Sequence, residues 1–475
     1  MTPAALPRLN ATTAPAAPYD RTRLEHGIVH LGVGAFQRAH MAQATDAAIA
    51  ADADLRWGIV GVSLRSAETH DALAPQDGLY TLAIRDADER GTPRERLQVI
   101  HCLCELLVAP DGPRAVHERI AAAATRIVSL TVTEKGYLAT EHGSTLDTLA
   151  RGLALRRQHG EAGVTLLSLD NLPGNGQVLR ERLLAHVRGH DPALADWIES
   201  HCSFPCSMVD RIVPRTTDAD RERISAHLGL VDAWPVVGEP FFDWVIEDDF
   251  AAGRPAWQHG GARFVADAKP FETLKLRMVN GSHSALAYLG AMAGWRTVDV
   301  AIAQPALRAY LDALLRDEIA TTLPALPGLD IADYRIRLLQ RYANPALQHR
   351  TAQIAMDGSQ KLPQRLLNTV RERLAAGQPI ARLGLAVAAW IHYLRGRDET
   401  GQAHEIADPL APQLALALRE AEAAPDPAAA FLAAPALAPV FGTDLAHDPR
   451  FARAVSQALG SLRAHGVQAT LAAWA

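Results

Sequence analysis

Cysteine, aromatic residues and long hydrophobic runs are all scarce in this sequence. Its 475 residues include four cysteines, and aromatic residues make up 5% of them. So few cysteines exclude the disulfide framework that small secreted domains use to replace a large core. The longest apolar run, residues 383–394, contains His392 and is shorter than the roughly 20 residues that cross a bilayer. We therefore expect no membrane span.

An excess of charge of one sign is also missing. Lys and Arg number 47 against 53 Asp and Glu, a formal charge of −6. This balance gives no electrostatic reason to bind nucleic acid or an anionic membrane. The first 20 residues have neither a basic start nor a continuous apolar run, so they do not resemble a signal peptide, and we expect an extended arm at residues 1–20 of a cytoplasmic protein. The remaining expectation is a small-molecule substrate.

Two halves of the chain differ in their apolar pattern. At about 150 residues per domain, the length favours two or three domains. Residues 21–268 alternate β-rich runs with helical stretches, which predicts an α/β domain with a mostly parallel sheet; the runs are GIVHLGVGAF, WGIVGVSL, TRIVSLTVTEKGY, GVTLLSLDN and WPVVGEP. Residues 269–475 carry long Ala/Leu patterns, which predict a mainly α-helical second domain.

The first predicted strand ends in the sequence GVGAFQRAH, residues 32–40. Gly32 and Gly34 at a strand-to-helix turn would let a pyrophosphate approach the backbone, as in a Rossmann-like dinucleotide site. The third position of the usual glycine fingerprint is Gln37, so a simple tight turn is the alternative. We expect Gly32, Gly34, Phe36 and Arg38 to contact the cofactor.

An acidic residue after the second strand would decide which dinucleotide binds. Glu68 follows WGIVGVSLRS and could accept the ribose hydroxyls, which favours NAD. A solvated glutamate at a helix start is the alternative interpretation, and Arg65 nearby leaves NADP open.

Four polar residues recur on one side of a predicted helix in FETLKLRMVNGSHSALAYLG. At about 100° per residue, Glu272, Lys275, Asn280 and His283 fall within one arc of about 140°. The same arithmetic surrounds Lys275 with apolar residues. A lysine there is either directed outward to solvent or desolvated, and desolvation is the condition for a general base at neutral pH.

Asn171 follows the strand GVTLLSLD, at the carboxyl end where α/β sheets place their ligands. Asn171 and Asn280 could together donate hydrogen bonds to an alkoxide oxygen. A turn formed by Asp170 and Asn171 before Pro173 is the structural alternative.

The combination of GVGAFQRAH, SLTVTEKGY, DNLPGNG, MVDRIVP, WVIEDDF, KLRMVNGSH and IAMDGSQKLP resembles the polyol-specific long-chain dehydrogenase/reductase family, also called the mannitol dehydrogenase family. The resemblance extends from about residue 27 to the C-terminus. It implies an NAD-binding domain, a helical domain, a cleft between them, chemistry without a metal site, and a monomer or weak homo-oligomer.

The resemblance also implies roles for individual residues. Lys275 becomes the general acid/base, and Asn171 and Asn280 hold the oxyanion. His283 orients the reacting oxygen. Either Glu272 or Glu134 relays the proton to solvent.

Substrates differ within the family, and the motifs of this chain are mixed. Gln353 stands where polyol-specific members carry arginine, and HRTxQIAMDGSQKLPQR resembles members that reduce hexuronates. In contrast, DNLPGNG and GVSLRS resemble members that oxidise mannitol. We favour a uronate, whose carboxylate Arg350 or Lys361 could neutralise. Asp210 in MVDRIVP is expected in the substrate site, with an internal ion pair to Arg211 as the alternative.

Overall fold

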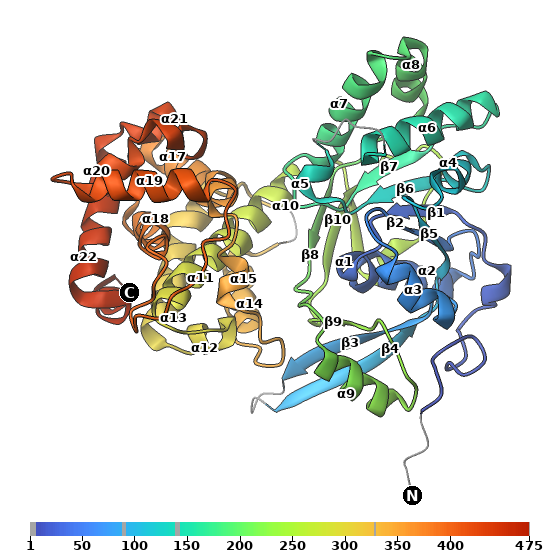
Figure 1. Cartoon of the computed structure of the whole chain (residues 1–475), viewed down its shortest axis with the longest axis horizontal. Helices are drawn as coiled ribbons and strands as arrows, with labels where there is room; N and C mark the ends of the chain where they lie inside the picture. Colours follow the sequence, from blue (N-terminus) through green and yellow to red (C-terminus); the bar gives the residue numbers. More distant parts are fainter. Residues whose placement is uncertain (1–5, 88–91, 138–142, 327–328, 475) are drawn as a thin grey trace, which may run out of the picture. The chain divides into compact units, whose positions relative to one another are not determined.

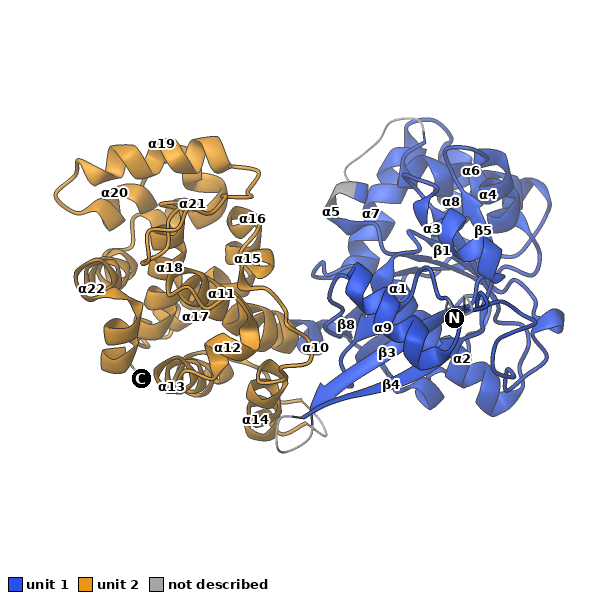
Figure 2. Cartoon of the chain, turned by 60° about the horizontal axis from the view of Figure 1, so that its bottom comes forward, with its two compact units in different colours: residues 1–88, 92–272 blue, residues 89–91, 273–475 orange. Residues whose placement is uncertain are grey.

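The computed structural model describes residues 6–87, 92–137, 143–326 and 329–474. They form two compact units, which Figure 2 shows in blue and orange. Unit 1 comprises the described residues up to Glu272, and unit 2 those from Thr273 onward. The predicted domain boundary at residue 268 lies just before helix α10 (Lys269–Leu274), in which the two units divide.

Unit 1 is built on a five-stranded sheet with the order β5-β2-β1-β6-β7, in which every pair is parallel. Its strands are β1 (Ile28–Leu31), β2 (Ile59–Ser63), β5 (Leu103–Val108), β6 (Ile127–Leu130) and β7 (Thr165–Ser168). The chain runs outward from β1 on one side and from β6 on the other. The carboxyl ends of β1 and β6 therefore form the topological switch point, where doubly wound sheets bind their ligands.

Both faces of this sheet are covered, as Figure 1 shows. Alternate residues of β1 enter different cores: Ile28 packs with helix α2, whereas Val29 and Leu31 pack with α4 and α6. Burial on both faces explains why the strands are continuous apolar runs. The helices of unit 1 are α1 (Ala35–Ala39), α2 (Met41–Asp52), α3 (Glu68–Leu73), α4 (Pro113–Ala121), α5 (Thr133–Gly136), α6 (Thr145–Gln158), α7 (Asn175–Arg188), α8 (Pro192–His201) and α9 (Asp218–Leu228).

Two three-stranded sheets complete unit 1, with orders β11-β10-β8 and β4-β3-β9. Their strands are β3 (Tyr80–Ala87), β4 (Pro93–Ile100), β8 (Ser207–Asp210), β9 (Val236–Gly238), β10 (Asp243–Glu247) and β11 (Ala262–Val265). The pairs β3/β4 and β8/β10 are antiparallel. The expectation of a mostly parallel sheet is thus right for the central sheet, and antiparallel pairing occurs in the two smaller ones.

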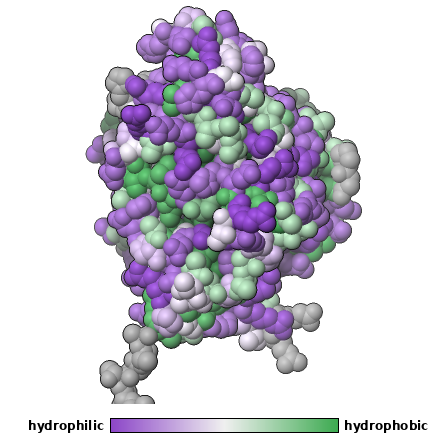
Figure 3. Space-filling view, turned by 90° about the vertical axis from the view of Figure 1, so that its right-hand side faces the viewer, coloured by the Kyte–Doolittle hydropathy of each residue, from purple (hydrophilic) through white to green (hydrophobic). Residues whose placement is uncertain are grey.

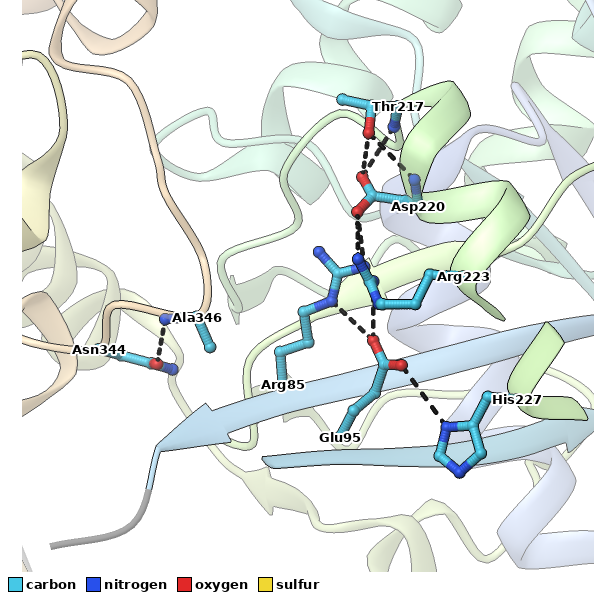
Figure 4. A network of polar contacts seen from close by, with 8 residues as sticks. All are labelled: Arg85, Glu95, Thr217, Asp220, Arg223, His227, Asn344 and Ala346. Atoms are coloured by element: carbon cyan, nitrogen blue, oxygen red, sulfur yellow. Dashed lines mark hydrogen bonds and ion pairs between the residues drawn. The ribbon is translucent and has the colours of Figure 1, made fainter. Parts of the chain in front are cut away.

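An ionic network ties α9 to the β3/β4 hairpin (Figure 4). Arg85 Nε lies 2.8 Å from Glu95 Oε1, and Arg85 Nη2 lies 2.7 Å from Asp220 Oδ1. Asp220 and Thr217 also form the capping box that begins α9. One carboxylate therefore caps the helix and attaches it to the sheet.

The N-terminal segment packs against unit 1 from residue 6 onward. Leu9 is fully buried, and its N–H donates to the Val231 carbonyl. Tyr19 donates to Asp46 Oδ1 at 2.6 Å. The described part of the predicted arm, residues 6–20, therefore contributes to the core.

Unit 2 is helical, as predicted. Helices α11 (Ser282–Met292) and α18 (Ala381–Tyr393) pack against each other, and α18 packs on α22 (Pro449–Trp474). Nearly all of α18 is buried, which accounts for the long apolar run in the sequence. The other α-helices are α12 (Val298–Ile302), α13 (Pro305–Ala313), α14 (Ile331–Tyr342), α15 (Thr351–Ile354), α16 (Gly358–Leu362), α17 (Asn368–Ala375), α19 (Ala411–Glu422), α20 (Pro427–Leu432) and α21 (Ala438–Ala446).

Three segments of unit 2 are π-helical: η4 (Lys275–Gly281), η5 (Leu314–Ile319) and η7 (Pro363–Leu367). Short 3-10 helices are η1 (Arg21–Arg23), η2 (Ala74–Gln76), η3 (Trp257–Gly260), η6 (Ala320–Thr322) and η8 (Pro435–Leu437). None of the described helices is long and apolar enough to cross a membrane. On the face drawn in Figure 3, apolar side chains form patches that polar side chains interrupt.

Candidate active site

The glycine turn after β1 is shaped to admit a ligand. Gly32 has φ +93°, and a Cβ there would lie 2.3 Å from the Thr131 carbonyl oxygen, so only glycine fits. Gly34 is exposed at the start of α1, and a Cβ built there meets only the Gly32 carbonyl, at 3.7 Å. At Gly32 the backbone lies too close to Thr131 for a side chain, whereas the space beside Gly34 is open. These residues fit the diphosphate of a dinucleotide.

The other predicted cofactor residues occupy different environments around this turn. Glu68 is exposed and begins α3, which follows the carboxyl end of β2. Phe36 is partly buried, and its ring stacks on His40 with 4.9 Å between centroids. Arg38 is buried and donates to the Trp234 carbonyl. Its guanidinium therefore supports the turn from within the protein.

Gln37 differs from all of these. Its side chain is fully buried, and neither amide atom has a hydrogen-bond partner among the described residues. The sequence marked Gln37 as a departure from the glycine fingerprint but gave no sign that it is buried.

Polar side chains connect the carboxyl ends of β1, β6 and β7. Thr131, just after β6, donates to the Gly32 carbonyl at 2.6 Å and lies 2.9 Å from His30 Nε2. Burial lowers the pKa of His30 to about 3, so the imidazole is neutral at physiological pH. The glycine turn after β1 and the end of β6 are thus held together at the switch point.

Asp170, just after β7, extends these connections. It is buried and accepts hydrogen bonds from the backbone N–H groups of Val132 and Thr133, and from the Tyr137 hydroxyl at 2.7 Å. Burial raises its pKa, and these hydrogen bonds oppose the rise. Thr133 has φ +64°, an uncommon backbone conformation for a β-branched residue.

Asn171 is exposed in the bend that follows. The buried amide is instead Asn175, which donates to the carbonyls of Ser168, Asp170 and Ser207. The Leu172 N–H donates to the Asp170 carbonyl at 2.9 Å, which closes the bend that carries Asn171.

Glu272 holds the next part of the same loop. Its Oε2 accepts the Gly174 N–H at 2.9 Å, while its Oε1 is buried without a hydrogen-bond partner in the described chain. Burial is the main cause of its raised pKa. Glu134, the alternative relay residue, lies in α5 after β6, and its side chain is outside the described part of the structure.

Asp210 ends β8 and is buried, in register with Asp243 of β10. Arg211 is also buried, and it donates to the carbonyls of Glu239 and Ala39 and to Gln43.

In unit 2, Lys275 begins the π-helical segment η4. The helical wheel assumed a continuous α-helix, so its angles are wrong between Lys275 and Gly281, where the backbone makes wider i→i+5 turns. Lys275 is only 6% exposed, and Met278 and Val279 of the same segment are buried. Asn280, near the end of the same segment, is half-buried.

The π-helical segment is supported from two sides. A Cβ at Gly281 would lie 2.7 Å from the Arg365 carbonyl, so glycine lets η7 pack closely against η4. Tyr342 donates to the Val279 carbonyl at 2.8 Å. π-helical turns inside α-helices occur frequently at functional sites.

His283 begins the next α-helical turn within a basic environment. Its ring stacks on Tyr342, with 5.1 Å between centroids, and its Nε2 is buried without a partner among the described residues. Its pKa lies well below the usual value, chiefly because of burial and then because of nearby basic groups: His349, Arg365, Arg341 and Lys361. His283 is therefore neutral.

The two predicted carboxylate-binding residues, Lys361 and Arg350, lie in different environments. Lys361 Nζ donates to the Met356 carbonyl and lies 4.0 Å from Asp357, and its charge acts on both His283 and His349. Arg350 is exposed and its backbone pairs with Thr297. The charges of Arg341 and Arg365 also act on His283, whereas Arg350 is not among the main causes of its lowered pKa.

Comparison with known proteins places this chain in a family. The model described as mannitol dehydrogenase Rossmann domain matches residues 26–259, and the mannitol dehydrogenase C-terminal domain matches residues 267–463. The chain belongs to the mannitol dehydrogenase family and is an oxidoreductase acting on CH–OH groups.

Its relatives act on more than one substrate class. It is 40% identical to a D-mannonate oxidoreductase of Escherichia coli, over 96% of this chain and 97% of the relative. It is 38% identical to a mannitol 2-dehydrogenase of Phaeosphaeria nodorum, over 99% and 84%. The solved mannitol 2-dehydrogenase of Pseudomonas fluorescens, a ternary complex with NAD and D-mannitol, is 37% identical with a TM-score of 0.88 and covers 98% of both chains.

Proposed function

We propose that this enzyme uses NADH to reduce the C5 ketone of D-fructuronate to the alcohol of D-mannonate. The observation that supports a sugar acid is the basic environment of His283, where the charges of Arg341, Arg365 and Lys361 all act on one buried imidazole. A carboxylate binds favourably to such a cluster, and a neutral polyol gains nothing from it. The likeness to the E. coli D-mannonate oxidoreductase supports the same substrate.

NAD is the proposed cofactor. The glycine turn at Gly32 and Gly34 would receive its diphosphate, and Glu68 after β2 would accept its ribose hydroxyls. When bound, NADH supplies the hydride that reduces the ketone carbon. NADP is the alternative because Arg65 is exposed in the same loop.

The chain supplies the proton and stabilises the oxygen. Lys275 donates a proton to the oxygen as it becomes an alkoxide, and in the reverse direction neutral Lys275 removes that proton. Asn171 and Asn280 donate hydrogen bonds to the developing charge, and neutral His283 orients the oxygen. Glu272 returns protons to Lys275 from solvent.

Oxidation of mannitol or arabinitol at a secondary alcohol is the second candidate. The P. fluorescens structure, with its bound D-mannitol, and the motif DNLPGNG favour it. NADH and NADPH oxidation should be assayed with fructuronate, tagaturonate and fructose. We expect the highest kcat/KM with fructuronate and NADH; a preference for fructose over both uronates would support the polyol enzyme instead.

A charge substitution tests the carboxylate site directly. Arg341→Gln should lower kcat/KM for fructuronate about tenfold, which corresponds to about 1.4 kcal/mol, while changing the rate with fructose less than twofold. Arg337→Gln removes the same charge from an exposed position of the same helix α14 and is the matched control. Equal losses with both substrates would place Arg341 outside carboxylate recognition.

A further inference from the structure

We infer that Asp170 is a positioning residue, whose carboxylate ties the strained start of α5 at Thr133 to the bend that carries Asn171, in the arrangement that the reaction needs. This inference rests on the proposed function, because it assigns Asn171 to the reacting oxygen. It concerns the carboxyl ends of β6 and β7, which are neighbours in the central sheet.

The first observation is how many donors converge on one carboxylate. Asp170 Oδ1 accepts the Val132 N–H at 3.0 Å and the Thr133 N–H at 2.9 Å, and Oδ2 accepts the Tyr137 hydroxyl at 2.7 Å. All three donors belong to the loop after β6. Asp170 itself is 8% exposed, so breaking these bonds would leave buried groups unsatisfied.

The second observation is the conformation that these bonds maintain. Thr133 has φ +64°, which costs free energy for a β-branched residue and persists only where the surroundings enforce it. The Asp170 carboxylate enforces this conformation, because it accepts hydrogen bonds from the backbone N–H groups of Val132 and Thr133. Such strained residues gather at functional sites.

The third observation links Asp170 to the other loop. Its carbonyl accepts the N–H of Leu172 at 2.9 Å and the side-chain amide of Asn175 at 3.1 Å. The backbone of residues 170–172 is therefore fixed at both sides of Asn171. Asp170 thus connects two segments at the ligand-binding edge of the sheet: its main-chain carbonyl belongs to the closed bend after β7, and its carboxylate binds the segment after β6.

Two substitutions separate position from charge. Asp170→Ala removes every side-chain acceptor, and we expect kcat to fall at least 30-fold while the dissociation constant of NADH changes less than threefold. Asp170→Asn keeps an acceptor for the two backbone N–H groups and an amide that can bond Tyr137, so kcat should stay within about fivefold of wild type. Equal loss in both variants would show that the negative charge acts, and would overturn the inference.

Relief of the strain provides a second criterion. Glycine adopts φ +64° without a Cβ penalty. The double variant that adds Thr133→Gly to Asp170→Ala should therefore have a kcat at least fivefold higher than Asp170→Ala alone. The inference fails if Asp170→Ala retains kcat within threefold of wild type, or if Thr133→Gly restores nothing. Whichever uronate or polyol the wild type turns over serves as substrate, so an error in the proposed substrate leaves this test intact.

A measurement without substrate completes the design. Amide hydrogen exchange at Val132 and Thr133 should be at least tenfold faster in Asp170→Ala than in wild type. If that variant does not fold, Tyr137→Phe, which removes one donor to Oδ2, should raise this exchange and lower kcat about threefold. If Tyr137→Phe then shows the same exchange rates and the same kcat as the wild type, the inference is overturned.

Discussion

Lys275 is the residue on which the proposed chemistry depends most directly. It is 6% exposed and begins a π-helical segment packed among apolar side chains. Removing its amine takes away the proton donor but leaves the backbone of the segment unchanged. We expect Lys275→Ala to fold normally, as seen by circular dichroism, and to lose at least a hundredfold in kcat at neutral pH. An unchanged rate would remove Lys275 from the mechanism.

Glu272 gives a prediction about pH and stability. Its folded-state pKa is raised above the ordinary value of 4.5, mainly by burial, so its charge destabilises the folded chain at any pH above the raised pKa. Glu272→Gln should therefore have a higher urea midpoint than wild type at pH 8. The difference should shrink as pH falls through the raised pKa and vanish below 4.5, where the carboxyl is neutral in both states.

The exposed Glu181 in helix α7 supplies the control for this comparison. Glu181→Gln should follow the wild-type midpoint at every pH. A Glu272→Gln midpoint that is lower than wild type at pH 8 would show that the charged form stabilises the fold.

At the scale of elements, the close packing of η4 on η7 depends on one glycine. Gly281→Ala would place a Cβ 2.7 Å from the Arg365 carbonyl, so one segment must shift. We expect a loss of about 1–3 kcal/mol in unfolding free energy, with a fall in kcat because Lys275 and Asn280 lie in the displaced segment.

Gly460 is the matched control, because it lies in α22 and an added Cβ meets nothing within 4 Å. Gly460→Ala should stabilise the chain by about 0.5–1 kcal/mol, through the better helix propensity of alanine, and leave kcat unchanged. If Gly281→Ala and Gly460→Ala change kcat by similar factors, the packing of η4 on η7 does not contribute to catalysis.

The elements that the sequence predicted well are those with a strong local pattern. The five apolar runs all contain strands, because burial on both faces makes a strand continuously apolar. The β3/β4 hairpin was missed because β4, PRERLQVI, is charged and mostly exposed along its first half. Its pairing comes from β3 and from the ion pairs of Arg85, which local patterns do not reveal.

The candidate site was only partly predictable for a related reason. Lys275, Asn280 and His283 share one short motif, so their spacing was visible. The π-helical turn was not, because KLRMVNG contains ordinary helix formers and the wider turn depends on packing against η7. Arg341 in α14 and Arg365 in η7 lower the pKa of His283 through their charges, although both are far from it in the sequence.

At the scale of the whole molecule, the described residues divide into two compact units. If NADH binds at the glycine turn of unit 1, it stabilises that unit by mass action, about 2.7 kcal/mol at a hundredfold excess over the dissociation constant. We expect amide exchange in β1 and β6 to slow about a hundredfold, and exchange in α18 and α22 to change little. Equal protection in both units would show that they unfold as one.

The number of residues between Lys275 and His283 matters more than the identity of those residues, because the π-helical segment sets how the two side chains are oriented relative to each other. An α-helix turns about 100° per residue, so deleting one residue there would rotate Lys275 by roughly a quarter turn relative to His283 and everything after it. An insertion or deletion of a single residue would disassemble the constellation even if every side chain were kept.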